Sequence, residues 1–359
     1  MSVFRLEKVE DFYEIGKVIG SGHFGQVRDV RERSSGTHWA GKFLKVKKVM
    51  DSGPGLDRRR VEEEVEILQA LQHENIMALQ DVFEEAAELV LIMELITGGE
   101  LFDYIAEKEN LLESEAIVFI KQILLGVKYM HSKQIVHFDL KPENIMLSDK
   151  KVPVPQIKII DFGLAQYLTP GVVYRSSCGT PQYIAPEVIR YEPLSSATDM
   201  WSIGVITYIL LSGMSPFQGD TDEETLNNIV AMNYEIEDRY FPDTSENAKE
   251  FIKNLLVKDQ SGRMTAEECL HHPWIKPLSR TQQKIRKRSS INMKNFKKFN
   301  AKRKWKLSYN MVLICYRLNQ LHSLRQKAAQ GYWEQKADSD QEEALAKPIS
   351  LNLQRCNSR

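Results

Sequence analysis

The sequence has few cysteines and no long apolar run, and both shortages limit what kind of protein it is. Its four cysteines lie far apart, at positions 178, 269, 315 and 356. Without paired spacings, neither a disulfide framework nor a zinc site is expected, and a reducing cytoplasmic location fits. The longest apolar stretch, residues 203–211, is too short to cross a bilayer, and the charged N-terminus lacks a signal-peptide core. Neither secretion nor integral membrane contact is therefore expected.

The net charge is also small, at −1 over 359 residues, but the charge is unevenly distributed. Residues 1–268 contain 44 acidic and 28 basic side chains, whereas residues 269–333 contain 16 basic side chains and no acidic one. An acidic body joined to a basic segment predicts an electrostatic contact within one molecule.

Hydrophobic periodicity divides the first 275 residues into a strand-rich part and a helical part. Alternating or β-branched runs at residues 12–20, 25–33, 37–45 and 88–95 predict a small antiparallel sheet. Apolar residues at helical spacing between Arg59 and Leu71 predict one amphipathic helix on that sheet. Six further helices are expected at residues 101–109, 114–132, 197–213, 222–233, 246–258 and 265–275. The predicted class is α+β, with a β-rich small lobe followed by a helical large lobe.

A glycine-rich stretch at residues 20–27 has the pattern G-x-G-x-x-G-x-V. Positions without side chains let backbone amides close over phosphate oxygens, although a plain hairpin turn produces the same pattern. The context favours a nucleotide site, because a predicted strand precedes the stretch and Lys42 follows on a later strand. Lys42 can neutralise the α- and β-phosphates, and Glu64 on the predicted helix can hold Lys42 by an ion pair.

The strongest signal for catalysis lies at residues 137–144, HFDLKPEN. A carboxylate (Asp139), a lysine two residues later (Lys141) and an amide five residues later (Asn144) form a known pattern. Its groups accept a substrate hydroxyl proton, contact a γ-phosphate and ligate Mg²⁺. Asp161, which begins Asp-Phe-Gly, supplies a second hard oxygen ligand. ATP and Mg²⁺ are therefore the expected cofactors.

These motifs stand in the order found in eukaryotic protein kinases, and residues 13–275 resemble such a domain, with an N-lobe at 13–96 and a C-lobe at 97–275. HFDLKPEN, LITGGELFDY, GTPQYIAPE and WSIGVITYILLSGMSPF resemble the death-associated protein kinase family, within the calcium/calmodulin-dependent group. The length and tail are most similar to the short type of that family. The resemblance implies a bilobal eukaryotic protein kinase fold with a C-terminal regulatory helix. It also implies serine/threonine phosphorylation, myosin regulatory light chain as a substrate, and roles in apoptosis and autophagy.

The resemblance also implies roles for single residues. Asp139 would be the catalytic base, Lys42 and Lys141 would bind phosphates, and Asn144 and Asp161 would bind magnesium. The nucleotide-binding set would be Ile19, Gly20, Ser21, Gly22, His23, Phe24, Gly25, Gln26, Val27, Ala40, Lys42, Met93, Glu94, Ile96, Glu100, Glu143, Met146 and Asp161. In this set Val27, Ala40 and Met146 would enclose adenine. The backbone of Glu94 and Ile96 would hydrogen-bond it, and Met93 would be the gatekeeper.

Two further sets follow from the same resemblance. Leu68, Leu79, His137 and Phe162 would stack into a spine that joins the lobes. Glu187 would pair with Arg263 and tie the activation segment to the large lobe. The alternative for the spine residues is that they are ordinary core residues. The alternative for the whole chain is a pseudokinase or scaffold that does not transfer phosphate. The presence of Lys42, Asp139 and both metal ligands disfavours the scaffold, and Lys141 disfavours tyrosine specificity.

Three departures from the family pattern bear on mechanism. Phe138 stands where most kinases have an arginine that pairs with a phosphorylated loop, so activity without loop phosphorylation is expected. Gln182 replaces one of three acidic residues that face basic substrates, whereas Glu100 and Glu143 remain. A weakened preference for Arg or Lys upstream of the target is therefore expected. The family's basic loop is diluted at residues 45–60, so homodimerisation through it stays open.

The tail carries a pattern typical of calmodulin targets. Trp305, Val312 and Leu318 fall at positions 1, 8 and 14 of a basic segment, so apolar anchors can fill a groove while the bases meet an acidic rim. Binding to an anionic membrane or to nucleic acid is the alternative, and is disfavoured. Residues 276–320 are predicted to be autoinhibitory and 321–359 a polar tail. Phosphorylation of Ser308 would weaken calmodulin binding.

Ser289 and Ser290 follow the basic residues 286–288. They fit either sites for a kinase that prefers basic sequences or solvated serines of a linker, and the linker interpretation is favoured.

Overall fold

The structure is a computed structural model that describes residues 4–22, 25–46, 57–85, 88–277, 279, 281–282, 284 and 289–308. The chain forms two compact units, residues 1–300 and residues 301–359. The first unit contains every helix and strand named below, apart from the end of the last helix. Among the described residues, no helix is both long enough and apolar enough to cross a membrane.

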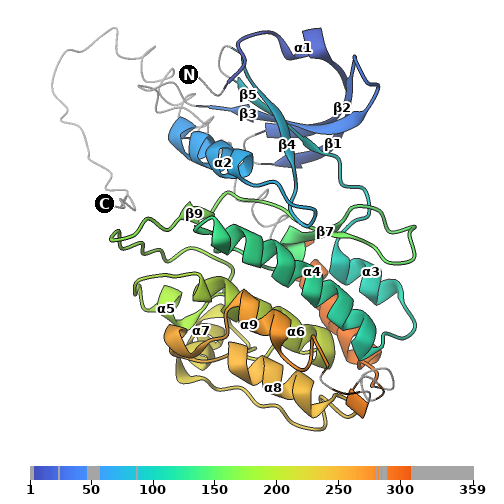
Figure 1. The fold of residues 1–359 in the computed structure, drawn as a ribbon, viewed down its shortest axis with the longest axis vertical. Coiled ribbons are helices and arrows are strands. Elements are labelled where there is room, and N and C mark those ends of the chain that lie inside the picture. Colours follow the sequence, from blue (N-terminus) through green and yellow to red (C-terminus); the bar gives the residue numbers. More distant parts are fainter. Residues whose placement is uncertain are drawn as a thin grey trace, which may run out of the picture. The chain divides into compact units, whose positions relative to one another are not determined.

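The N-terminal lobe is an antiparallel five-stranded sheet with the order β1-β2-β3-β5-β4 (Figure 1). Its strands are β1 (Tyr13–Gly22), β2 (Gly25–Glu32), β3 (His38–Lys45), β4 (Leu79–Glu85) and β5 (Glu88–Glu94). Helix α1 (Val9–Phe12) precedes them, and α2 (Arg58–Ala70) buries Val61, Val65 and Leu68. The four predicted strands and the helix are confirmed. Strand β4 was not predicted, because acidic residues interrupt its apolar pattern.

The C-terminal lobe is helical and is built around α6 (Ala197–Ser212). This helix is apolar on every side, and it packs against α4 (Glu113–Ser132) and α8 (Glu246–Leu255). The other helices are α3 (Leu101–Glu107), α5 (Pro186–Ile189), α7 (Asp222–Ala231) and α9 (Ala266–His271). The six helices expected after Gly98 are confirmed, with ends that differ by a few residues. The additional helix α5 is a single turn.

Short elements position the loops between the lobes. Strand β6 (Ile135–Val136) pairs with β9 (Gln166–Tyr167), and β7 (Ile145–Leu147) pairs with β8 (Ile157–Ile159). The 3-10 turn η1 (Pro142–Asn144) lies directly before β7, whereas η2 (Gln260–Gly262) precedes α9. Residues 137–144 and 161–163 are therefore each held at both ends by a strand pair.

The chain after the helical lobe folds back onto it. The carbonyl of Ser289 accepts a hydrogen bond from the Glu113 amide at 2.9 Å, and Ile291 donates to the Leu111 carbonyl at 2.9 Å. A helix then covers residues 293–308, and Phe296 packs against Phe102 with ring centroids 5.2 Å apart. Ser289 is only 6% exposed. The interpretation of Ser289 as a solvated linker residue is therefore wrong, because Ser289 is buried and its carbonyl is bonded by the first residue of α4.

Candidate active site

The glycine-rich stretch forms the end of a strand pair. Gly20 faces Val27, Ser21 faces Gln26 and Gly22 faces Gly25, while Ile19 precedes them on β1. The connecting residues His23 and Phe24 lie outside the described residues. A Cβ atom at Gly25 would lie 1.8 Å from the Phe43 carbonyl oxygen. The close approach of β2 and β3 thus requires this glycine independently of any ligand.

The lysine and glutamate predicted to pair do form an ion pair. Lys42 on β3 donates to Glu64 on α2, with 2.9 Å between Nζ and Oε1. Both side chains are largely buried, so the pair holds α2 against the sheet and fixes the ammonium beside the glycine-rich strands. The predicted contact between Lys42 and Glu64 is confirmed.

The residues expected around adenine come from both lobes. Ala40 on β3 pairs with Met93 on β5, and both are buried. The chain after Ile96 crosses to the second lobe, where Glu100 forms a bridge with Met146 on β7. Val27 on β2 pairs with Lys42. The structure therefore brings these residues to one boundary between the lobes.

Within the loop at residues 137–144, two side chains bond the Asp139 carboxylate. Lys141 Nζ lies 2.6 Å from Asp139 Oδ2, and it also donates to Thr180 Oγ1 at 3.3 Å. Asn144 Nδ2 donates to the Asp139 carbonyl at 2.8 Å and to its Oδ2 at 3.2 Å. Asp139 is thus oriented by Lys141 and Asn144, and a hydroxyl-bearing residue of the activation segment lies beside them.

A buried aspartate on α6 anchors this loop. Asp199 Oδ2 accepts from the His137 amide at 3.0 Å, and Oδ1 accepts from the Phe138 amide at 2.9 Å. The His131 ring lies 2.9 Å from the same carboxylate. Burial alone would raise the pKa of Asp199, but the His131 hydrogen bond and the nearby histidine charges outweigh it and lower the pKa. Phe138 needs this support because its φ is +61°.

The donor set for a metal consists of hard oxygens. The side-chain nitrogen of Asn144 donates to Asp139. The side-chain oxygen of Asn144 is therefore the atom that could bind a metal. The Asp161 side chain is exposed and has φ +62°, and Phe162 behind it is buried against His137 at 5.0 Å. Mg²⁺ is usually bound by one or two protein oxygens plus phosphate oxygens and water. Asn144 and Asp161 fit that requirement, although the described residues contain no cluster of three or more His, Cys, Asp or Glu that could hold a metal alone.

Two contacts order the activation segment. The Phe138 ring stacks on Tyr174, with centroids 5.2 Å apart and planes 24° apart. Glu187 forms a bidentate, fully buried pair with Arg263, at 2.7 Å for both oxygens. The predicted pairing of Glu187 with Arg263 is confirmed. The Tyr174 stack was not predicted, because sequence separation hides which residue faces position 138.

The structure describes all four predicted spine residues but only two of the four predicted tail residues. Leu68, His137 and Phe162 are fully buried, and Leu79 packs against the same core. Trp305 and Ser308 lie on the helix at residues 293–308, and Trp305 is 67% exposed. Val312 and Leu318 lie outside the described residues. Sequence reasoning missed the roles of Thr180 and His131. The only available signal for His131 was that α4 ends just before the catalytic loop.

Comparison with known proteins agrees with this geometry. The model of the protein kinase domain matches residues 13–275. Death-associated protein kinase 2 of Mus musculus is 50% identical over 360 residues, covering 100% of this chain and 97% of the relative.

Two solved structures are also similar to this chain. A Caenorhabditis elegans twitchin kinase fragment has 37% identity and a TM-score of 0.78, over 85% of this chain and 66% of that one. The serine kinase domain of the giant muscle protein titin has 36% identity and a TM-score of 0.72, over 82% and 88%. This chain therefore belongs to the protein kinase family and, within it, to the death-associated protein kinases, which are serine/threonine kinases.

Proposed function

We propose that this serine/threonine kinase is autoinhibited by its basic tail and activated by calcium-loaded calmodulin. We further propose that it phosphorylates basic sequences such as that of myosin regulatory light chain, in cytoplasmic apoptosis and autophagy signalling. The observation that carries the proposal is the basic helix at residues 293–308, which lies C-terminal to the kinase domain in the chain and exposes Trp305. A basic helix with an exposed aromatic anchor is the kind of segment that calmodulin binds.

For phosphoryl transfer, we assign Asp139 as the group that accepts the proton of the substrate hydroxyl. Lys141 and Asn144 hold its carboxylate in place, so the base does not have to be ordered during the reaction. When bound, ATP with Mg²⁺ supplies the transferable phosphoryl group. Lys42, fixed by Glu64, contributes positive charge toward the phosphates, and Asn144 and Asp161 contribute the metal-binding oxygens.

For substrate choice, we assign Glu100 and Glu143 as the acids that favour Arg or Lys near the target. Glu100 is joined to β7 through Met146, and Glu143 lies in η1, so both belong to the same boundary as the catalytic loop. Gln182 has no charge to offer there. The expected basic preference is therefore present but modest, and a peptide-array profile without any basic preference would contradict it.

For regulation, the charge distribution supports an inhibitory tail. Residues 1–268 are strongly acidic and residues 269–333 contain only basic charges, so the tail can occupy the substrate site as a pseudosubstrate. Calmodulin that binds the released helix would shift the population toward the open state. The titin domain is named as autoinhibited and the twitchin fragment as autoregulated, which is in line with such control in relatives.

Phosphorylation of Ser308 would oppose calmodulin binding. Ser308 is exposed at the end of the described helix, among basic residues, and a phosphate would add negative charge facing the acidic rim of calmodulin. We expect Ser308→Asp to bind calmodulin less tightly than the unmodified protein in a calorimetric titration. Equal affinities would contradict this assignment.

The deciding experiment measures radiolabel transfer to a basic serine peptide and to myosin light chain, with and without Ca²⁺/calmodulin. The full chain is compared with a shortened chain that ends at Pro277. We expect the full chain to be slow until calmodulin is added and the shortened chain to be fast throughout. Equal rates for both would exclude the inhibitory tail but keep the kinase. Failure of both would favour a scaffold that does not transfer phosphate.

A further inference from the structure

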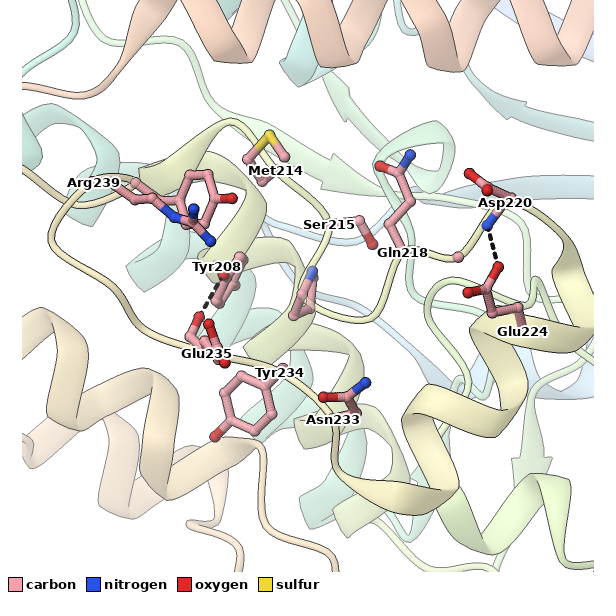
Figure 2. A pocket seen from close by; sticks show the side chains of 13 residues that line it. Tyr208, Met214, Ser215, Gln218, Asp220, Glu224, Asn233, Tyr234, Glu235 and Arg239 are labelled. Carbon is pink, nitrogen blue, oxygen red and sulfur yellow. Dashed lines mark hydrogen bonds between the residues drawn. The ribbon is translucent and has the colours of Figure 1, made fainter.

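A cavity in the C-terminal lobe is lined by residues other than those assigned to catalysis. It has a volume of about 390 Å³ and is formed by the end of α6, the loop that follows, the start of α7 and residues 233–240 (Figure 2). Three tyrosines, Tyr208, Tyr234 and Tyr240, contribute to its walls. The Tyr208 hydroxyl donates to the Glu235 carbonyl at 2.7 Å, which ties α6 to the far wall.

The hydroxyl of Ser215, which lines this cavity, has no hydrogen-bond partner among the residues that the structure describes. Ser215 is 6% exposed, and its Oγ atom makes no hydrogen bond among the described residues. Figure 2 shows Ser215 between Met214 and Gln218, with its hydroxyl directed among the lining side chains. A buried hydroxyl without a partner destabilises the fold unless a ligand or water bonds it. The group is therefore an acceptor or donor available to a ligand that enters the cavity.

The charge of the cavity favours a cation. Its lining contains the carboxylates of Asp220, Glu224 and Glu235 and a single guanidinium, that of Arg239. Arg239 is already bound to Glu237 at 2.9 Å. Its guanidinium also lies 4.6 Å from the centre of the Tyr240 ring, so a cation stacked on tyrosine already occurs at this rim. The neighbouring Glu237 raises the pKa of Glu235, first through a hydrogen bond and then by its charge, because two carboxyl groups lie close together.

We propose that this cavity binds an arginine or lysine side chain of the protein substrate, at a distance from the phosphorylated residue. The tyrosine walls would stack on the cationic group, Asp220 and Glu235 would supply opposite charge, and Ser215 would contribute its free hydroxyl. A bare metal ion is a poorer occupant, because the described residues contain no cluster of three or more metal-ligating side chains. The proposal deepens the proposed preference for basic substrates and rests on it.

The position of the cavity determines how many residues should separate the phosphorylated residue from the distal basic residue. Asp199 near the start of α6 holds the catalytic loop, and Ser215 follows the end of the same helix. At about 1.5 Å of rise per residue, the two are separated by roughly 20 Å along the axis. An extended peptide advances about 3.3 Å per residue, so the distal basic residue should lie roughly six residues or more from the target.

The test uses a set of peptides and the full chain, assayed with Ca²⁺/calmodulin. All peptides share one core sequence with a target serine and a nearby arginine. A single further arginine is placed from about four to about ten residues away from the serine, on either side of it. We expect one placement to lower KM roughly two- to tenfold, with kcat unchanged. The double variant Asp220→Asn/Glu235→Gln should lose this gain, whereas Glu223→Gln/Glu250→Gln should keep it. Glu223 is exposed in the first turn of α7, close in sequence to Asp220, but does not line the cavity. Glu250 is exposed on α8 and does not line it either.

Ser215→Ala supplies a second variant that should fold at least as well as the unmodified protein. It should reduce the gain from the distal arginine without changing KM for the core peptide. Direct binding of an arginine peptide that lacks Ser and Thr, followed by fluorescence anisotropy, gives a readout independent of phosphorylation. If the core peptide is phosphorylated but no distal arginine lowers KM, or if the double variant keeps the gain, the cavity is not a substrate subsite. If the core peptide is not phosphorylated, the proposed function fails, and the anisotropy measurement alone decides on the cavity.

Discussion

At the scale of single residues, the site is organised around the Asp139 carboxylate. Lys141 and Asn144 both donate hydrogen bonds to it, and the loop that contains it is hydrogen-bonded to the buried Asp199. These contacts are made before any substrate arrives, so little reorganisation remains for the reaction itself. Changes to Asp139 should therefore alter rate far more than stability.

Asp139→Asn keeps the shape and hydrogen-bonding capacity of the side chain but removes its basicity. We expect kcat to fall by roughly 10²- to 10⁴-fold, with the melting temperature nearly unchanged. Single-turnover phosphorylation and thermal unfolding measure the two effects. Asp149→Asn, an exposed carboxylate near the same loop, is the matched control and should leave kcat alone. A variant with normal kcat would rule out Asp139 as the base.

The pH dependence of stability is a second residue-scale prediction, and it concerns Asp199. Its pKa is lowered in the folded state, so the carboxylate stabilises the fold above the unfolded value of about 3.8. That contribution is lost as pH falls further toward the folded pKa. Urea unfolding between about pH 5 and pH 2 should therefore show a steeper acid loss for the native protein than for Asp199→Asn. Parallel curves would show that Asp199 is not a source of this acid sensitivity.

At the scale of elements, the activation segment is held by two contacts of different kinds. Phe138, at the position where most kinases have an arginine, stacks on Tyr174, and the Glu187–Arg263 pair holds the end of the segment. An aromatic pair contributes about 0.5–1.5 kcal/mol beyond its burial, whereas removing one partner of a buried ion pair costs about 3–5 kcal/mol. The first contact should tune activity, and the second should maintain the fold.

The stack predicts activity without loop phosphorylation. Ser176→Ala and Ser177→Ala should keep nearly full kcat, with Thr180→Ala assayed separately because Thr180 contacts Lys141. Tyr174→Ala should lower kcat roughly 2- to 10-fold, and Tyr174→Phe should restore it because the ring stack remains. Dependence of kcat on a phosphate at Ser176 or Ser177 would refute this account of Phe138.

The buried ion pair predicts a large loss of stability. Arg263→Met leaves the Glu187 carboxylate buried without its partner, and we expect unfolding free energy to fall by about 3–5 kcal/mol. Lys150→Met removes an exposed pair with Glu107 and should cost less than about 1 kcal/mol. Chemical denaturation of both variants gives the comparison. Similar losses for the two would mean that burial does not govern the strength of these pairs.

At the scale of the whole molecule, opposite charges are placed on consecutive parts of one chain. If the basic tail inhibits by charge, salt should weaken the inhibition because screening shortens the reach of exposed charges. Raising NaCl from about 50 to about 300 mM should increase the basal rate of the full chain relative to the chain ending at Pro277. Steady-state phosphorylation without calmodulin measures this ratio. A ratio independent of salt would point to an apolar rather than an electrostatic contact.

The sequence by itself determined the two-lobed plan and most of the chemistry. These features follow from local patterns in the sequence: the alternation of apolar residues in the β strands, the apolar surface of α6, and the spacing from Asp139 to Asn144. The ion pair of Lys42 with Glu64 was predicted from the motif context and that of Arg263 with Glu187 from the family resemblance, and the geometry confirmed both. The acidic strand β4 was missed because its pairing with β5 outweighs a weak local pattern.

Only the tertiary structure decided which distant groups meet. Tyr174 faces Phe138, Ser289 is buried beside Glu113, and Ser215, whose hydroxyl has no hydrogen-bond partner among the described residues, lies in a cavity with tyrosines from α6 and from residues 233–240. None of these contacts has a repeating pattern in the chain, because each depends on how whole helices and loops pack. Periodicity reports the environment of a residue along its own element, whereas a partner on another element is fixed only when the complete core closes.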